Sequence, residues 1–281
     1  MPTFDTPGPI TATIDVVVGA VRISAGDPGA AVVDVRPSDT SNEEDVKAAQ
    51  QTRAEYANEQ LLVRSPKLRS WLPRSRGASV DVTIQLPAGS EVRGAGQMTD
   101  FDCDGSLGDC RIKTGMGQIS IDQAEALILK SGIGDISVDR ATGHAEVTTG
   151  SGDVRVRELD ASAVIKNSNG DTWVGVAGGD LRIKAANGSI AVDLARATLG
   201  AKSANGDVRV GEAVRDSVVL ETSLGEVEVG IREGTAAWLD VRAAAGKVLN
   251  SLESAEAPES SAEAVQVRAR TTAGNVVIRR P

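Results

Sequence analysis

One phrase recurs from Arg111 to Gly211 at almost constant pitch: IKTGMGQISID at 112–122, LKSGIGDISVD at 129–139, VTTGSGDVRVR at 147–157, IKNSNGDTWVG at 165–175, IKAANGSIAVD at 183–193 and AKSANGDVRVG at 201–211. The glycine at the sixth position of each phrase is termed the turn glycine, and successive turn glycines are 17, 18, 18, 18 and 18 residues apart. Three looser copies follow after steps of 19, 21 and 28 residues. A fixed period near 20 residues is typical of proteins built from stacked repeats. The turn glycines are Gly117, Gly134, Gly152, Gly170, Gly188, Gly206, Gly225, Gly246 and Gly274.

Apolar residues alternate with polar ones on both sides of each turn glycine. Around Gly188, for example, Leu181 and Ile183 precede the glycine, and Ile190 and Val192 follow it. Alternation rich in β-branched residues predicts two short strands per copy, each with one buried face. The glycine between them supplies the positive φ that a sharp turn requires.

A single copy cannot bury its apolar side alone, whereas copies stacked about 4.8 Å apart in parallel register share a continuous aliphatic core. The sequence therefore predicts an all-β fold, a β-solenoid similar to a parallel β-helix, with about 18 residues per coil over residues 91–281. An antiparallel β-sandwich is the alternative, because its strands also alternate. It predicts irregular loop lengths, which the constant steps disfavour.

Residues 1–90 differ from the repeats and are expected to form an N-terminal β segment that caps the solenoid or packs on it. Residues 42–59 contain no Gly or Pro and are rich in helix formers, so one short helix is expected there, capped by Ser41 or Asn42. The acidic, low-complexity stretch 251–264 accounts for the 28-residue step. We expect it to form a loop, after which Val265–Pro281 returns to form the last coil.

The composition narrows the class of partner. A net charge of −9 and a pI near 4.8 disfavour nucleic acid or an anionic membrane. No run approaches the roughly 18 apolar residues of a membrane span, and the first residues lack the basic and apolar regions of a secretory signal. The sequence thus predicts a soluble cytoplasmic protein, with a surface adhesin as the weaker alternative. Cys103 and Cys110 are too few for a disulfide scaffold, and Cys110 falls in a predicted core column.

Two columns of charged residues flank the turn glycines on the outward side, a mostly basic one four residues before and a mostly acidic one directly after. Neighbouring ladders of opposite charge offset their own repulsion, and Asp is favoured in turns, so a structural role explains them. Binding of a protein partner is the other explanation. It makes both columns, together with Trp173, the candidate interaction surface. The basic ladder consists of Lys130, Lys166, Lys184 and Lys202, and the acidic ladder consists of Asp135, Asp153, Asp171 and Asp207.

No motif in the sequence indicates a catalytic, cofactor or metal site. His144 is the only histidine, it falls in a predicted turn, and no motif pairs it with a nucleophile. Asp100, Asp102 and Asp104 lie among glycines but lack the spacing of a calcium loop. The repeat also differs from the calcium β-roll unit, because Gly-Asp occurs only once per coil. We therefore expect no enzyme activity, no cofactor and no bound metal.

Several phrases resemble a known family. The Gly-Asp copies, with NSNGDTWV at 167–174 and AANG at 185–188, are similar to the bacterial β-strand-repeat domain of unknown function called the "putative adhesin" or Toastrack domain. The similarity extends from FDTPGPI at 4–10 through GTAAWLD at 234–240 to NVVIRR at 275–280, and soluble actinobacterial members look closest. The resemblance implies a β-solenoid that serves as an adhesion or multimeric platform module. It carries no catalytic residues onto this chain.

The sequence therefore predicts a non-catalytic scaffold that binds a protein through its charged ladders or assembles through the ends of its coils. The alternative is a β-solenoid that binds or cleaves carbohydrate, with Trp173 and Asp171 in its groove.

Overall fold

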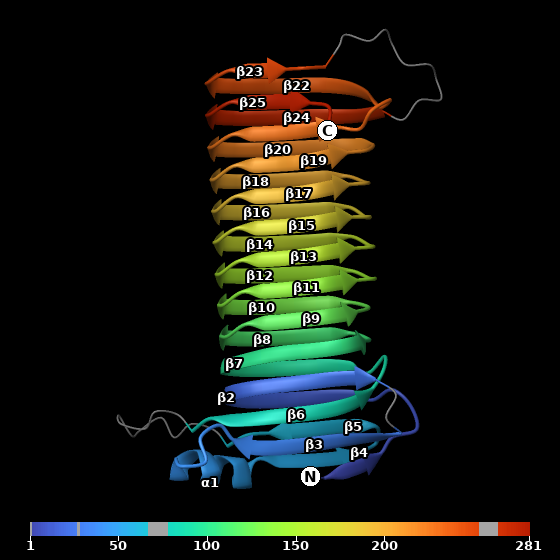
Figure 1. The fold of residues 1–281 in the computed structure, drawn as a ribbon, viewed down its shortest axis with the longest axis vertical. Coiled ribbons are helices and arrows are strands. Elements are labelled where there is room, and N and C mark those ends of the chain that lie inside the picture. Colours follow the sequence, from blue (N-terminus) through green and yellow to red (C-terminus); the bar gives the residue numbers. More distant parts are fainter. Residues whose placement is uncertain (1, 27–28, 67–77, 253–263) are drawn as a thin grey trace. The chain divides into compact units, whose positions relative to one another are not determined.

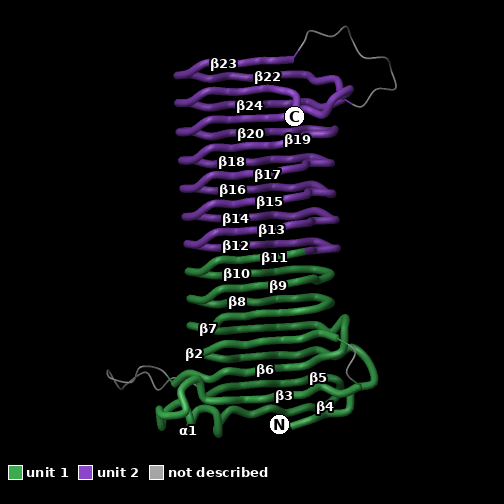
Figure 2. The backbone as a smooth tube through the Cα atoms, viewed as in Figure 1, with its two compact units in different colours: residues 1–139 green, residues 140–281 purple. Residues whose placement is uncertain are grey.

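The computed structural model describes residues 2–26, 29–66, 78–252 and 264–281. The chain forms two compact units, Met1–Asp139 and Arg140–Pro281 (Figure 2). Both consist mainly of stacked parallel strands, so the predicted β-solenoid is confirmed and the antiparallel sandwich is wrong. The predicted boundary between residues 90 and 91 does not coincide with the division into units, and β7 begins there. Most of the predicted acidic loop, residues 253–263, lies outside the described residues.

In the second unit, each turn glycine separates a strand of one sheet from a strand of another, and the strands of each sheet stack one above the next (Figure 1). Among the described residues, the strand pairings within this unit are parallel. The pre-glycine sheet contains, in order of pairing, β12 (Ala145–Ser151), β14 (Ala163–Asn169), β16 (Leu181–Asn187), β18 (Leu199–Asn205), β20 (Asp216–Leu224), β24 (Ala264–Ala273) and β22 (Ala236–Ala245). The post-glycine sheet contains β13 (Val154–Leu159), β15 (Thr172–Ala177), β17 (Ile190–Ala195), β19 (Val208–Ala213), β21 (Val227–Ile231), β25 (Val276–Arg279) and β23 (Val248–Asn250).

The turn glycines are fixed by two constraints. Gly188 has a φ of +144°, a conformation that L side chains rarely adopt. A Cβ on Gly188 would also lie 2.0 Å from the carbonyl oxygen of Gly170 in the preceding coil. A side chain at this position would therefore force neighbouring coils apart, which explains why the glycine recurs in every copy.

A column of hydroxyl groups runs inside the stack, three residues before each turn glycine. Ser203 donates a hydrogen bond of 3.0 Å to the carbonyl of Gly188, and Thr222 donates one of 2.8 Å to the carbonyl of Gly206. Thr271 does the same to Gly225 at 2.9 Å. These hydroxyls are buried, so each provides a partner for a turn carbonyl that would otherwise lack one in the core. The sequence analysis did not identify this column.

The column is interrupted at Ala185, which has no donor for the carbonyl of Gly170. Asn167, in the same column one coil earlier, makes up for the loss. Its amide nitrogen lies 3.0 Å from the carbonyl oxygen of Gly152 and 2.9 Å from that of Gly170. Two N–H groups on one side chain thus serve two coils, although the buried Oδ1 of Asn167 has no partner among the described residues.

The last two coils do not follow sequence order. The strand β24 pairs with β20 on one edge and with β22 on the other. The segment from Ala264 to the C-terminus therefore lies between the coil of β20–β21 and the coil of β22–β23 (Figure 1). The coil that ends the second unit is Ala236–Asn250, whereas the sequence had placed Val265–Pro281 last.

In the first unit β2 (Thr11–Gly26) is a long strand that makes a complete coil, and it pairs in parallel with β5 and β6 along one edge. Gly19, with a φ of +139°, turns it between the two sheets, and β2 pairs in parallel with β7 (Glu91–Leu107) along most of its length. Strands β8 to β11 continue the repeat, and β1, β3 and β4 form antiparallel pairs. The remaining strands are β1 (Thr3–Asp5), β3 (Ala30–Pro37), β4 (Arg53–Ala57), β5 (Gln60–Arg64), β6 (Val80–Pro87), β8 (Cys110–Met116), β9 (Ile119–Ala124), β10 (Leu127–Ile133) and β11 (Ile136–Ala141).

The single helix is shorter than the sequence indicated. It covers Glu43–Gln51 (α1), and Asn42 caps its N-terminus by accepting a hydrogen bond from the backbone N–H of Glu44. A helix was predicted over 42–59, but the second half of this range forms the strand β4, which pairs with β5. In the turn between the two strands, Asn58 and Glu59 both have positive φ. Tertiary pairing with β5 overrides the local helix propensity of this segment.

We expect Asn167 and Ala185 to be energetically coupled. The change Asn167→Ser should leave the carbonyl of Gly170 without a donor and lower the free energy of unfolding by about 1–2 kcal/mol. Adding Ala185→Ser should restore the donor and recover most of the loss, because Ser is the residue that serves this role at position 203. Urea unfolding of the two single variants and the double variant measures the coupling. Strictly additive effects would show that the two positions do not share this carbonyl.

We expect both cysteines to be unreactive in the folded protein. Cys103 and Cys110 are buried, and a hydrogen bond with the Cys110 thiol, together with burial, raises the pKa of Cys103 well above its usual range. Since the thiolate is the reactive form, Ellman's reagent at pH 8 should label neither thiol in buffer and both in urea. Rapid labelling of Cys103 without urea would contradict this packing.

Candidate functional site

The acidic ladder has a backbone role in the second unit. The Oδ1 of Asp153 accepts the backbone N–H of Asp171 at 3.0 Å, and the Oδ1 of Asp171 accepts that of Ser189 at 2.8 Å. Asp207 does the same for Glu226 at 2.7 Å. Each carboxylate thus pairs the first N–H after the turn glycine of the next coil.

An uncharged side chain at the same position accepts the same hydrogen bond. In the last-paired coils the Oδ1 of Asn275 takes the backbone N–H of Lys247 at 3.1 Å. In the first unit Asp100 accepts the N–H of Gln118 at 2.8 Å, and Asp135 directly follows the turn glycine of its own coil. The turn therefore explains the recurrence of Asp in this column without a partner, and binding by the acidic ladder stays a prediction.

The basic ladder is free of such a role. In the pre-glycine sheet Lys166, Lys184 and Lys202 lie side by side in register, and their side chains are exposed. Lys202 pairs with Glu221 at 3.1 Å. Lys166 and Lys184 have no ion-pair partner among the residues that the structure describes. Lys130 belongs to the first unit, where it lies in register with Lys113.

Beside the basic ladder the surface of the pre-glycine sheet is hollowed. A depression of about 450 Å³ is lined by Val164, Arg182, Gly200 and Val219, with His144 at its rim. A smaller one of about 160 Å³ shares Arg182, Gly200 and Val219 and extends to Lys184 and Lys202. We call the two together the Gly200 hollow. It exists because small residues occupy an outward column, and nothing lies within 4 Å of the place where a Cβ on Gly200 would be.

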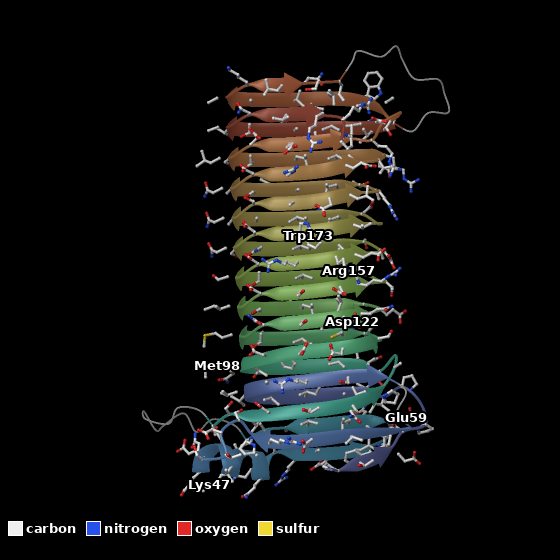
Figure 3. The ribbon with its side chains drawn as sticks, in the orientation of Figure 1. Lys47, Glu59, Met98, Asp122, Arg157 and Trp173 are labelled. Atoms are coloured by element: carbon white, nitrogen blue, oxygen red, sulfur yellow. The ribbon has the colours of Figure 1, made fainter. Side chains whose placement is uncertain are left out.

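Trp173 lies on the other sheet. Its indole N–H donates to the Oδ1 of Asp193 at 3.2 Å, and its six-membered ring passes close to Gly175. Figure 3 shows Trp173 on the surface of the stack. Asp171 lies two residues before Trp173, and its carboxylate accepts the backbone N–H of Ser189. The carbohydrate groove with both residues stays a prediction.

The remaining candidates also have ordinary surface partners. The Nδ1 of His144 lies 2.9 Å from the hydroxyl of Ser162, and its ring is exposed. Among the described residues there is no cluster of three or more His, Cys, Asp or Glu side chains that could hold a metal ion. The structure describes no helix long and apolar enough to cross a membrane.

The sequence analysis missed the Gly200 hollow. Its signal was present: six residues before the turn glycine, Gly200 and Val219 stand where the neighbouring coil has Arg182. A smaller side chain in one outward column indicates a hollow only when it is known which strands lie next to each other in space.

A comparison with family models agrees with the fold. A family model described as Toastrack DUF4097 matches residues 14–279. The chain belongs to the Toastrack DUF4097 family. Three solved structures are similar to this Toastrack chain. A "putative adhesin" from Bacteroides fragilis NCTC 9343 has 11% identity and a TM-score of 0.41, over 100% of this chain and 95% of that chain.

A "putative adhesin" from Parabacteroides distasonis ATCC 8503 has 13% identity and a TM-score of 0.42, over 98% of this chain and 95% of that chain. A "putative cell adhesion protein" from Clostridium sporogenes ATCC 15579 has 12% identity and a TM-score of 0.23, over 99% and 96%. No curated protein matches the Toastrack chain described here.

We expect Asp171→Asn to be nearly neutral and Asp171→Ala to be destabilising. Asparagine keeps an acceptor for the N–H of Ser189, as Asn275 does for Lys247, whereas alanine removes it at a cost of about 1 kcal/mol. Thermal and urea unfolding measure the difference. Equal destabilisation by both changes would show that the charge, and not the acceptor, is what the turn requires.

Proposed function

We propose that this Toastrack protein is a non-catalytic interaction scaffold that holds an acidic, extended polypeptide segment on the outward face of the pre-glycine sheet. The segment lies over the Gly200 hollow, with its carboxylates beside the basic ladder. The cytoplasmic location predicted from the sequence is kept as part of the proposal, and a surface adhesin with the same contact surface is the alternative.

One observation carries the proposal. In a chain with a net charge of −9, the exposed Arg182 and Lys184 line the hollow, and Lys166 lies in register beside Lys184. These three cations lack ion-pair partners among the described residues. Cations that the fold does not neutralise attract an acidic partner and orient it. The floor of Val164, Gly200 and Val219 gives the partner's apolar side chains a place to pack.

The net negative charge of the chain favours an acidic polypeptide over nucleic acid as the partner. A densely charged polyanion such as nucleic acid would be repelled by the acidic chain as a whole. A polypeptide in which acidic and apolar residues alternate carries fewer charges and offers side chains for the hollow. Strand-like segments of this kind are bound along sheet surfaces and edges in many complexes.

The test uses a labelled peptide of alternating Glu and Val, with fluorescence anisotropy as the measurement. The change Gly200→Val should fill the hollow while the stack is kept, because the added side chain enters open space and valine favours strands. We expect it to weaken binding at least tenfold without lowering the melting temperature. Lys166→Gln with Lys184→Gln should weaken binding and flatten its dependence on salt.

The matched control removes two cations from the opposite sheet of the same unit. Arg155→Gln with Arg209→Gln changes the net charge equally but affects cations already paired with Asp153 and Glu228. It should leave peptide binding unchanged. The proposal fails if the wild-type protein does not bind the peptide, if the control weakens binding as much as the lysine pair does, or if double-stranded DNA displaces the peptide.

A further inference from the structure

The coil Ala236–Asn250 ends the second unit with an open edge. Its strand β22 pairs only with β24, and β23 pairs only with β25, among the described residues. The inward residues Leu239 and Val241 are partly exposed, whereas Val267 and Ala269 in the coil beneath are buried. Trp238, Val248 and Leu249 are exposed by 66%, 42% and 50%. Within the described part of the chain, this coil therefore presents both unpaired backbone and uncovered core.

The edge lacks the features that normally block further pairing. Natural edge strands are short, or carry proline, bulges or inward-pointing charges. In the first unit the antiparallel strands β1 and β4 are three and five residues long. By contrast β22 has ten residues without proline, and its charges, Asp240 and Arg242, lie on the outward side.

We propose that the occupant of this edge is a second copy of the chain, paired through β22 in antiparallel orientation about a two-fold axis at Val241. The inference deepens the proposed scaffold function by naming a partner for one end of the second unit. It is independent of whether the Gly200 hollow binds an acidic segment.

The backbone geometry permits this register. In the coils below, the inward residue seven before the turn glycine donates its backbone N–H to the next coil, as Ala163 does to Asp180 and Leu181 does to Thr198. Leu239 has this position in β22, and backbone groups alternate along a strand, so residues 239, 241 and 243 direct theirs to the open edge. A two-fold axis at Val241 brings each odd-numbered residue opposite another odd-numbered residue, as hydrogen-bonded antiparallel pairs require.

The side chains are self-complementary in the same register. Asp240 faces Arg242 of the second copy, and Trp238 faces Ala244, on the outward side. On the inward side Leu239 faces Ala243, and the two Val241 residues meet on the axis. Directly opposed residues with opposite charge, or with large and small side chains, stabilise antiparallel pairs. No like charges face one another.

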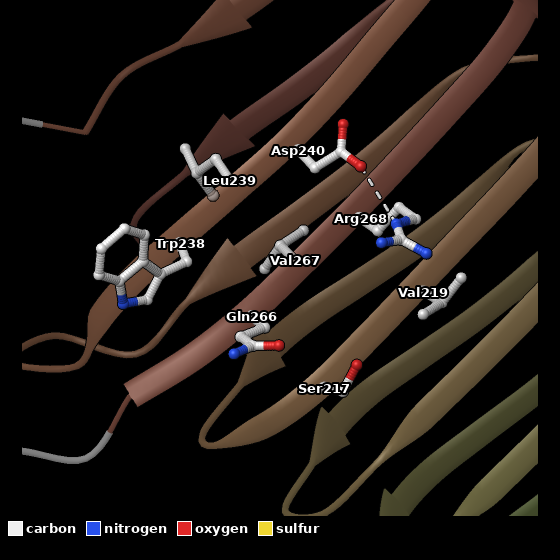
Figure 4. A pocket seen from close by; sticks show the side chains of 8 residues that line it. All are labelled: Ser217, Val219, Trp238, Leu239, Asp240, Gln266, Val267 and Arg268. Atoms are coloured by element: carbon white, nitrogen blue, oxygen red, sulfur yellow. Dashed lines mark hydrogen bonds and ion pairs between the residues drawn. The ribbon is translucent and has the colours of Figure 1, made fainter.

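The immediate surroundings hold the charged pair in place. Asp240 lies 3.1 Å from both Arg268 and Arg270 of the coil beneath, and Figure 4 shows the Asp240–Arg268 pair with the indole of Trp238 projecting away from it. The hydrogen bond from Arg270, with that from Arg268, lowers the pKa of the Asp240 carboxyl. Arg242 has no ion-pair partner among the described residues, so it is available for Asp240 of a second copy.

The experiment is light scattering coupled to size exclusion over a concentration series of the full chain. The wild-type protein should reach twice its 29.0 kDa mass at high concentration. Arg242→Asp sets two aspartates against each other and should weaken the dimer at least tenfold. Arg182→Asp makes the same charge change on the same sheet, away from the edge, and should leave the dimer intact.

Amide hydrogen exchange of β22 gives a second readout. Dimerisation should protect residues 239, 241 and 243, and Arg242→Asp should remove that protection. The proposal is overturned by a wild-type monomer at every concentration, whether its odd-numbered amides exchange freely or are protected by the chain's own segment 253–263. A dimer that Arg242→Asp does not weaken also overturns it. Peptide binding by a monomeric variant would leave the scaffold function standing, which separates the two failures.

Discussion

The close approach of successive turn glycines is the constraint on which the rest of the stack depends. The carbonyl oxygen of each turn glycine occupies the space in which the next coil would place a Cβ, as Gly170 does for Gly188. The same carbonyl then accepts a hydrogen bond from a buried hydroxyl or amide three residues before a turn glycine, and the following N–H is paired by an aspartate. Three positions of each repeat are therefore determined by one backbone contact.

This constraint also explains where the chain tolerates variation. Register at the turn glycines must be kept, so additional residues are placed at the opposite turn of the coil. The 19-residue step places its extra residue near Asp216, whose φ is +66°, and the 21-residue step places its extra residues near Gly234. The narrow core between the sheets is filled by aliphatic columns, which accounts for an aromatic content of only 2%.

Much of this architecture could be predicted from the sequence, because period and alternation report directly on stacking. The apolar columns and the turn glycines are patterns within a single copy. The hydroxyl column was not predicted, since Ser203 resembles a turn residue until the carbonyl of Gly188 is known to lie beside it. The order of the last coils was wrong for a related reason: the columns show that β22 and β24 both belong to the stack, but not which one is inserted next to β20. Helix propensity wrongly predicted a helix at Arg53–Ala57, where pairing with β5 forms a strand instead.

The candidate site is identified by the difference between residues that recur in every coil and residues that do not. In a stack of nearly identical coils, a residue that recurs at one position in every copy is explained by the coil itself, as the aspartates are by the turn. Residues that serve a partner are expected where a column departs from its pattern. The outward column departs at Gly200 and Val219, beside cations that the fold leaves unpaired. The inward columns depart at Ala236–Asn250, where no further coil among the described residues covers the core. In both proposals the contacts fall on backbone and side chains that the repeat alone does not require.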